Sequence, residues 1–198
     1  DNYGPATLTH VTATASGGSY STGIRSDAPD AAASSAAVLK DVTATASGSS
    51  SGNYAIQNNA STTLFNVTAT ASGSAESYGV FNNGSSAVPT LTNVVVSASG
   101  STSNYGLYVI NGSSSTLDNV TVTTSGGTFN FGVYIDTGST AIIRDSAFTG
   151  STNSLVNSAS TTRLATSMLS GSVVNSGGTL TCVGAYSGSF VALNTTCQ

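Results

Sequence analysis

Side chains that could carry out acid–base, nucleophilic or metal chemistry are few and scattered in this chain of 198 residues. It contains eight Asp and Glu residues, four Lys and Arg residues and one His. Only Asp27 and Asp30 are near neighbours, and this pair around Pro29 could hold calcium weakly, although a solvated turn is the more common arrangement. Motifs for a phosphate-binding loop, a serine nucleophile elbow or a zinc protease do not occur. We therefore expect no enzymatic activity, no metal and no cofactor.

The composition narrows the possible partners. Charged residues make up 6% of the chain, against roughly a quarter in ordinary soluble domains, and the net charge is −4. A nucleic-acid partner would need clustered cations, which are missing. Hydrophobic residues reach 38%, but no apolar run approaches the roughly 18 residues of a membrane span. The sequence predicts a folded domain without a nucleic-acid partner or a membrane span.

The two cysteines, Cys182 and Cys197, lie close to the C-terminus. Two cysteines in a chain rich in Ser and Thr fit an oxidising, extracellular or cell-surface setting. A metal site would need more ligands. A disulfide between them would close a short terminal loop and add about 3 kcal/mol of stability.

The sequence contains an internal repeat, and the repeated segments are the structural elements that would position any functional site. Segments of the type LTHVTATASG begin at Leu8, Leu39, Leu64, Leu91 and Leu117, with degraded copies at Ile143 and Leu164. Each copy has a second block, such as YGVF or YGLYV, followed by a turn dipeptide such as Asn83-Gly84. Units of this size that repeat in sequence stack on one another, and each pairs only with its neighbours.

Alternation within one copy predicts strands. From Leu64 to Ser72, the residues at 64, 67, 69 and 71 point inward, the residues at 68, 70 and 72 point outward, and the chain bends at Asn66. Strands that recur once per coil pair in parallel, which describes an all-β solenoid. A leucine-rich repeat is the alternative, but it normally needs a helical segment in each copy, and none is present.

The recurring L-x-N-V-T-x-T-x-S-G and Y-G-V-x-x-N units resemble those of right-handed parallel β-helix repeat proteins, the pectin-lyase-like superfamily. The ending LTCVGAYSGSFVALNTTC is similar to the Cys-containing end of secreted bacterial members. The resemblance implies a right-handed parallel β-helix of about seven coils over residues 1–171, with residues 172–198 as a disulfide-bearing cap of the same domain. It implies no particular activity, since the superfamily includes lyases, hydrolases, phage fibres and adhesins.

Positions that recur in every coil form columns along the stack. Inward Leu and Val columns form the core. Ala13, Ala44 and Ala69 give way to Val96, Val122 and Phe148 in one inward column, which predicts a cross-section that widens toward the C-terminus.

The bend column holds the polar residues His10, Asp41, Asn66, Asn93, Asn119 and Asp145. Asn and Asp tolerate left-handed backbone conformations and bond to neighbouring backbone. We expect a buried ladder of hydrogen bonds from coil to coil, which leaves the only His without a chemical role. Asn66 and Asn119 also begin glycosylation sequons, which the repeat produces anyway.

Two outward surfaces could bind ligands. The first is a lattice of Thr side chains: Thr12, Thr14, Thr43, Thr45, Thr68, Thr70, Thr121 and Thr123. It resembles the ice-binding faces of β-helical antifreeze proteins, although Thr is also well suited to any exposed strand. The second is an aromatic strip of Phe81, Tyr108 and Tyr134, which suits sugar rings or a partner protein unless a loop covers it. Asp118 and Arg144 are expected on adjacent coils, where they could pair.

These features predict a non-enzymatic extracellular structural or adhesive β-helix that could form part of a fibre or surface protein. A carbohydrate-binding or carbohydrate-cleaving pectin-lyase-like protein is the alternative, and ice binding is third. Asn2-Tyr3-Gly4 matches Asn104-Tyr105-Gly106 of a later coil, so the chain is expected to start in mid-repeat. Upstream sequence or a second copy, joined head to tail, would then cover the first coil.

Overall fold

The chain forms a stack of β-strand coils in a computed structural model that describes residues 6–27, 37–100 and 102–198. The described residues form seventeen strands in one continuous sheet and no helix. None of these residues belongs to a helix long and apolar enough to cross a membrane. Asn2, Tyr3 and Gly4, the expected mid-repeat start, and Asp30 lie outside the described residues.

Each coil contributes strands in a fixed order. In chain order they are β1 (Thr7–Thr9), β2 (Thr12–Ser16), β3 (Tyr20–Asp27), β4 (Ala37–Ser47), β5 (Gly52–Asn59), β6 (Thr62–Ser72), β7 (Glu76–Asn83), β8 (Thr90–Ser99), β9 (Ser103–Ile110), β10 (Ser114–Ser125), β11 (Phe129–Ile135), β12 (Thr140–Arg144), β13 (Ala147–Ser158), β14 (Thr161–Ala165), β15 (Met168–Ser176), β16 (Thr179–Val183) and β17 (Tyr186–Ser187).

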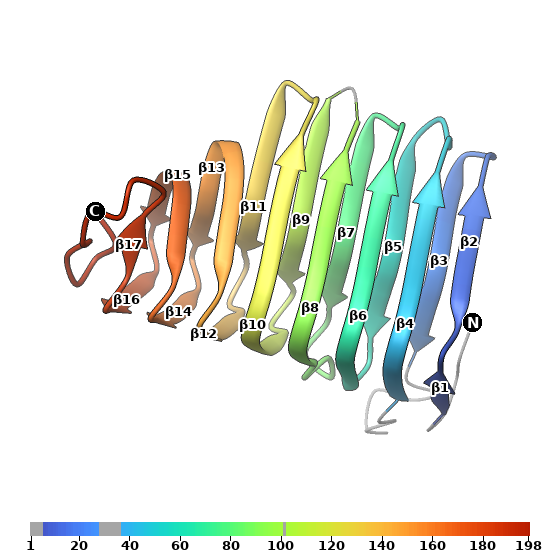
Figure 1. The fold of residues 1–198 in the computed structure, drawn as a ribbon, viewed down its shortest axis with the longest axis horizontal. Helices are drawn as coiled ribbons and strands as arrows, with labels where there is room; N and C mark the ends of the chain where they lie inside the picture. The colour runs from blue at the N-terminus through green and yellow to red at the C-terminus, as the bar shows by residue number, and fades with distance from the viewer. Residues whose placement is uncertain (1–5, 28–36, 101) are drawn as a thin grey trace.

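The coils wind in the right-handed sense. In Figure 1, β2, β4, β6, β8 and β10 rise along the front, and β3, β5, β7, β9 and β11 descend behind them as the chain advances toward the C-terminus. Every pairing between the named strands is parallel, for example β4 with β6 and β6 with β8. The predicted right-handed parallel β-helix is confirmed: seven coils and a partial eighth made by β16 and β17.

The repeated Leu places the core. Leu39 pairs in register with Leu64, Leu64 with Leu91, and Leu91 with Leu117. All four side chains are at most 1% exposed. Burying one such side chain contributes about 1.5–3 kcal/mol, so the column provides a continuous apolar spine.

The cross-section does not widen toward the C-terminus, contrary to expectation. Where the inward column grows from Ala69 to Val96 and Val122, the opposite strand carries Gly79 and Gly106. A Cβ at Gly79 would lie 2.2 Å from Cγ1 of Val96, and one at Gly106 would lie 2.0 Å from Cγ1 of Val122. The larger side chains therefore occupy space that the glycines leave free. From β12 onward the coils are visibly shorter in Figure 1.

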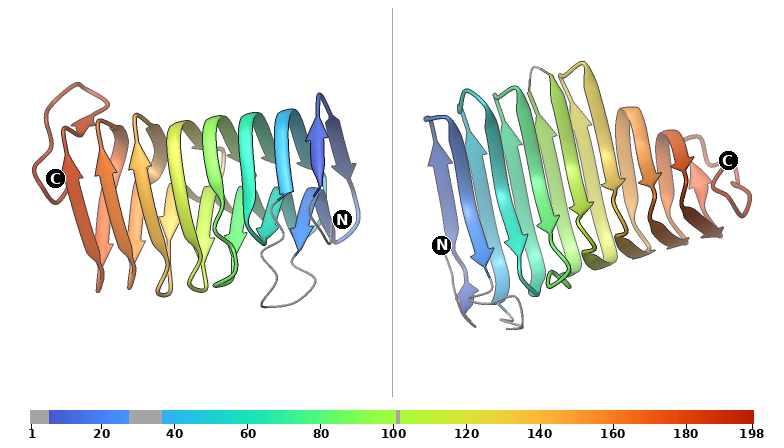
Figure 2. Two further views of the ribbon diagram at one scale, coloured as in Figure 1. Left: turned by 90° about the horizontal axis from the view of Figure 1, so that it is seen from below. Right: turned by 180° about the vertical axis from the view of Figure 1, so that it is seen from behind.

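The C-terminal segment closes the last coil. Parallel pairing continues past residue 171, through β15 with β17 and β14 with β16, so the coils extend further than the expected boundary. The chain then turns back, and Tyr186 pairs antiparallel with Ala192. The predicted disulfide between Cys182 and Cys197 is confirmed, with a Cα–Cα distance of 5.4 Å. Figure 2 shows this segment at the end of the stack.

Replacing Gly106 with Ala tests how closely the front and back rows of strands approach each other. The added Cβ would lie 2.0 Å from Cγ1 of Val122 and 2.7 Å from the carbonyl oxygen of Gly132. We expect Gly106→Ala to lower the free energy of unfolding by about 1–3 kcal/mol. Adding Val122→Ala should restore part of that loss. Urea denaturation measures both, and an unchanged midpoint for Gly106→Ala would contradict the tight approach.

Candidate functional site

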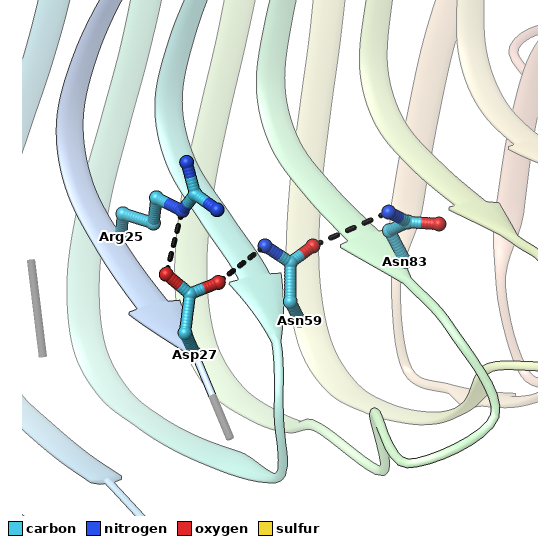
Figure 3. Close-up of polar contacts among 4 residues, drawn as sticks. All are labelled: Arg25, Asp27, Asn59 and Asn83. Carbon is cyan, nitrogen blue, oxygen red and sulfur yellow. Dashed lines mark hydrogen bonds and ion pairs between the residues drawn. The ribbon is translucent and has the colours of Figure 1, made fainter. Parts of the chain in front are cut away.

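The acidic side chains of the described residues are not gathered into a metal site. The described residues contain no group of three or more His, Cys, Asp or Glu side chains that could hold a metal ion. Asp27, half of the expected calcium pair, instead forms an ion pair with Arg25, with Nε 2.7 Å from Oδ2. Its Oδ1 accepts a hydrogen bond from the Asn59 amide at 2.6 Å (Figure 3).

The expected pairing of Asp118 with Arg144 does not form. The two residues are register neighbours on β10 and β12. The ion pairs within the described part of the chain are His10 with Asp41 and Arg25 with Asp27. Register proximity on the surface is therefore not sufficient for an ion pair, which agrees with the small free energy of such pairs in water.

The bend column adopts one backbone conformation throughout. His10, Asp41, Asn66, Asn93, Asn119 and Asp145 all have φ between 49° and 56°. Thr166 continues the column with φ 48°, and Gly184 with φ 63°. This left-handed region favours Asn, Asp and Gly, which explains why the bend position carries these residue types.

Side chains of the bend column bond along the axis. The Asn66 amide donates to Asp41 at 2.9 Å, Asn93 donates to Asn66 at 3.1 Å, and Asn119 donates to Asn93 at 2.8 Å. His10 Nε2 lies 3.7 Å from Asp41 Oδ2. The ladder is exposed, not buried as expected, because the side chains project from the outer side of the bend. The side-chain amides of Asn66 and Asn119, which begin two of the sequons, are donors in this ladder.

A second ladder at another corner was not predicted. It runs from Asp27 through Asn59 to Asn83, which donates to Asn59 at 3.3 Å (Figure 3). It continues to Asn111, which donates to Asn83 at 2.8 Å. The Asn-containing turn dipeptides were a signal for it in the sequence. As in the bend column, the polar side chains of this ladder form hydrogen bonds with the adjacent coil.

Buried amides line the inner side of the same corner. Asn58 donates to Asn82 at 2.8 Å, and Asn82 donates to Ser115 at 3.1 Å. All three residues are at most 1% exposed. Since an unpaired buried amide is costly, these bonds fix the register of neighbouring coils.

Aromatic residues form a band of two columns on the sheet of β5, β7, β9 and β11. The first column is Tyr54, Tyr78, Tyr105 and Phe131, and the second is Phe81, Tyr108 and Tyr134. Rings in the first column stack at 4.7, 5.0 and 5.1 Å between centroids. Rings in the second lie 5.6 and 5.3 Å apart, inclined by 59° and 74°.

Only the second column was predicted, because the first violates simple alternation. Tyr78 and Phe81 are three residues apart, and their rings are 5.4 Å apart. Gly79 and Val80 between them are both buried, so the strand bends locally at the glycine. This bend brings two outward side chains together where a regular strand would separate them.

The ring faces of the first column are covered, whereas the predicted strip of Phe81, Tyr108 and Tyr134 is partly exposed. In the first column, ring planes differ by 1° between Tyr54 and Tyr78 and by 6° between Tyr78 and Tyr105, so each face is covered by the next ring. Tyr78 is only 7% exposed. The other rings of the band are partly exposed.

Burial raises the pKa of the tyrosines in the band. Desolvation is the main cause for Tyr78 and Tyr108, and the nearby Glu76 and Asp136 carboxylates add to it. The pKa values of Tyr54, Tyr105 and Tyr134 are raised for the same leading reason. The Tyr78 hydroxyl donates to Glu76 at 3.1 Å, and the Tyr108 hydroxyl donates to Asp136 at 3.5 Å. The neutral phenols are therefore favoured in the folded state.

The predicted Thr lattice lies on the other sheet, on β2, β4, β6 and β10. Six of its residues are exposed, whereas Thr45 and Thr70 are partly exposed. In β8 the equivalent positions are Val95 and Ser97. The lattice and the aromatic band thus occupy separate faces of the coil, as the front and back rows of strands in Figure 1 show.

Substitutions at Asn93 separate the two roles of the bend residue. Asn93→Leu places a branched side chain at φ 55° and removes both ladder bonds, so we expect a loss of about 1–3 kcal/mol. Asn93→Gly keeps the backbone conformation accessible and removes only the ladder bonds, so its loss should be smaller. Thr68→Ala on the exposed face serves as the control. Thermal unfolding measures the stability of each variant. If Asn93→Gly destabilises the protein as much as Asn93→Leu or more, the backbone argument is refuted.

The raised tyrosine pKa values predict a loss of stability at high pH. An unfolded tyrosine titrates near its ordinary value of 10.0, whereas the folded pKa is higher, so the unfolded chain releases its phenolic protons first. Stability should be complete below about pH 10 and should fall as the pH rises above it. Urea midpoints at about pH 8 and about pH 11 measure this. Tyr108→Phe should reduce the pH dependence, and equal wild-type midpoints would contradict the assignment.

Comparison of the chain with protein-family models, with curated proteins and with solved structures finds no match. The resemblance to pectin-lyase-like repeat proteins therefore rests on the repeat motifs. The function has to be argued from the side chains that the coils present on their surface.

Proposed function

We propose that this protein is a non-enzymatic β-helical rod that serves as a structural or adhesive element outside the cell. The observation that carries the proposal is the set of axial columns: the Asn and Asp ladders at two corners and the stacked aromatic rings. In these columns the polar and aromatic side chains form hydrogen bonds or ring contacts with the adjacent coil. Such contacts stiffen a rod along its axis.

The residues that line the hollows on the described surface support a non-catalytic role. Four shallow hollows on the described surface are lined mainly by small, apolar and hydroxyl-bearing residues, together with Arg25, Arg144 and Arg163. Catalysis of polysaccharide cleavage needs a pair of carboxyl groups, or a carboxylate and a base, in one concave site. None of the described residues that line these four hollows is Asp, Glu or His.

The cysteine pair supports the location. The disulfide between Cys182 and Cys197 indicates an oxidising, extracellular environment. Both cysteines are at most 2% exposed, so the bond belongs to the packed end of the stack. The low charge content limits repulsion between neighbouring rods, which suits assembly into a fibre or a surface layer.

Immunogold electron microscopy of the source cells tests the structural proposal. We expect label on fibres or on the cell surface, and the purified protein should release no sugar from polysaccharides under assay. Label confined to the cell interior would contradict the location, and turnover of any polysaccharide would contradict the non-enzymatic role.

Adhesion to carbohydrate is the second candidate, because the partly exposed rings of the aromatic band extend over four successive coils. Aromatic rings and hydroxyl groups supply the apolar and hydrogen-bonding contacts that sugars use. A glycan array measures this binding. We expect Tyr108→Ala to weaken it at least about tenfold, equivalent to 1.4 kcal/mol, and Thr68→Ala on the other sheet to leave it unchanged. Equal binding by both variants would exclude the band as the site.

A further inference from the structure

The exposed sheet opposite the aromatic band carries a second, independent surface, which we call the threonine face. It consists of Thr12, Thr14, Thr43, Thr45, Thr68, Thr70, Thr121 and Thr123, with Val95 and Ser97 at the equivalent positions of β8. Cα register runs without a shift along both rows, from Thr12 through Thr43, Thr68 and Val95 to Thr121, and from Thr14 through Thr45, Thr70 and Ser97 to Thr123.

The rows form a two-dimensional lattice with fixed spacing. Neighbouring coils are about 4.8 Å apart, and residues two apart on a strand are about 6.6–6.8 Å apart. A third row of Ser16, Ser47, Ser72, Ser99 and Ser125 continues the lattice in the same register. Figure 1 shows β2, β4, β6, β8 and β10 side by side and running in the same direction, so the lattice extends over five coils.

The packed core beneath the face holds the lattice rigid. The residues between the Thr rows point inward, and Ala44, Ala69, Val96 and Val122 among them are at most 1% exposed. Thr is also stiff at χ1 because it is branched at Cβ. The hydroxyl and methyl groups therefore keep their positions without a large loss of entropy on binding.

The chemistry of the face selects a particular class of ligand. Its three rows contain hydroxyl groups, methyl groups and one exposed Val95, and no charged or aromatic side chain. A protein interface typically centres on aromatic or Arg residues, and a nucleic acid requires cations. A periodic array of small hydroxyl and methyl groups can instead order water at the same period. Crystalline water is a ligand that presents a periodic array of hydrogen-bonding groups.

We propose that the threonine face binds the surface of ice crystals. The hydroxyl groups hydrogen-bond to lattice water, and the methyl groups occupy the spaces between the water molecules. The Thr70 hydroxyl lies 3.2 Å from the Ser97 hydroxyl, so the contact between β6 and β8 preserves the row where Thr is replaced. The inference is independent of the structural role, since it concerns the other face of the coil.

Ice shaping and thermal hysteresis of the purified full chain test the proposal. The wild-type protein at millimolar concentration should shape ice crystals and depress the freezing point below the melting point. The double variant Thr68→Lys/Thr70→Lys, at the centre of the lattice, should lose at least about nine-tenths of the hysteresis. The matched control is Thr90→Lys/Thr92→Lys, likewise two residues apart on one strand (β8) with one exposed and one partly exposed side chain, before the bend and outside the lattice. It should retain the activity.

Circular dichroism melts establish that both variants fold. A wild-type protein without hysteresis or ice shaping overturns the proposal. So does equal loss in the lattice variant and the control, because this would mean that added charge acts without regard to position. Tyr108→Ala should leave ice shaping intact, so failure of glycan binding and failure of ice binding are distinguished in the same set of proteins.

Discussion

In-register parallel stacking is the constraint on which the rest of the structure depends. Each residue lies about 4.8 Å from its equivalent in the next coil. The side chains at equivalent positions must therefore pack against or bond to one another. Leu packs on Leu, amide bonds to amide, and ring stacks on ring. Charged residues fail this test, because like charges at this spacing repel each other. The 6% charge content therefore follows from the architecture, as does the mixture of Ser, Thr, Asn, Gly and Val.

The stacking rule also divides the coil into surfaces with different roles. Corners require left-handed backbone, which selects Asn and Asp, and the stacked amides then bond along the axis. Flat strand segments have no such requirement, so their outward positions are free to repeat a small side chain such as Thr. Gly79 and Gly106 leave space for Val96 and Val122 on the inside, and the outer surface of the same strands gathers two columns of rings. The same repeat thus produces a stiffening corner, an aromatic band and a hydroxyl lattice.

Much of this could be predicted from the sequence, because the repeat shows directly which positions are equivalent. The Leu column, the bend at Asn66 and the pairing of Cys182 with Cys197 follow from spacing and residue type. The inner aromatic column could not be found by alternation, since the bend at Gly79 makes positions 78 and 81 face the same way. The absence of widening at Val96 and Val122 was missed because the space opposite these side chains depends on glycines in another strand. The Asn ladder is exposed because its side chains project from the outer side of the bend. Residue types alone do not specify the direction of these side chains.

Measurement of nuclear Overhauser effects between coils tests the central claim most directly, namely that side chains meet their own equivalents along the axis. The account predicts contacts between the rings of Tyr54 and Tyr78 and between those of Tyr78 and Tyr105, whose centroids are 4.7 and 5.0 Å apart. It also predicts contacts between the side-chain amides of Asn66 and Asn93. Ring contacts shifted by two residues, or amide contacts confined within one coil, would contradict in-register stacking.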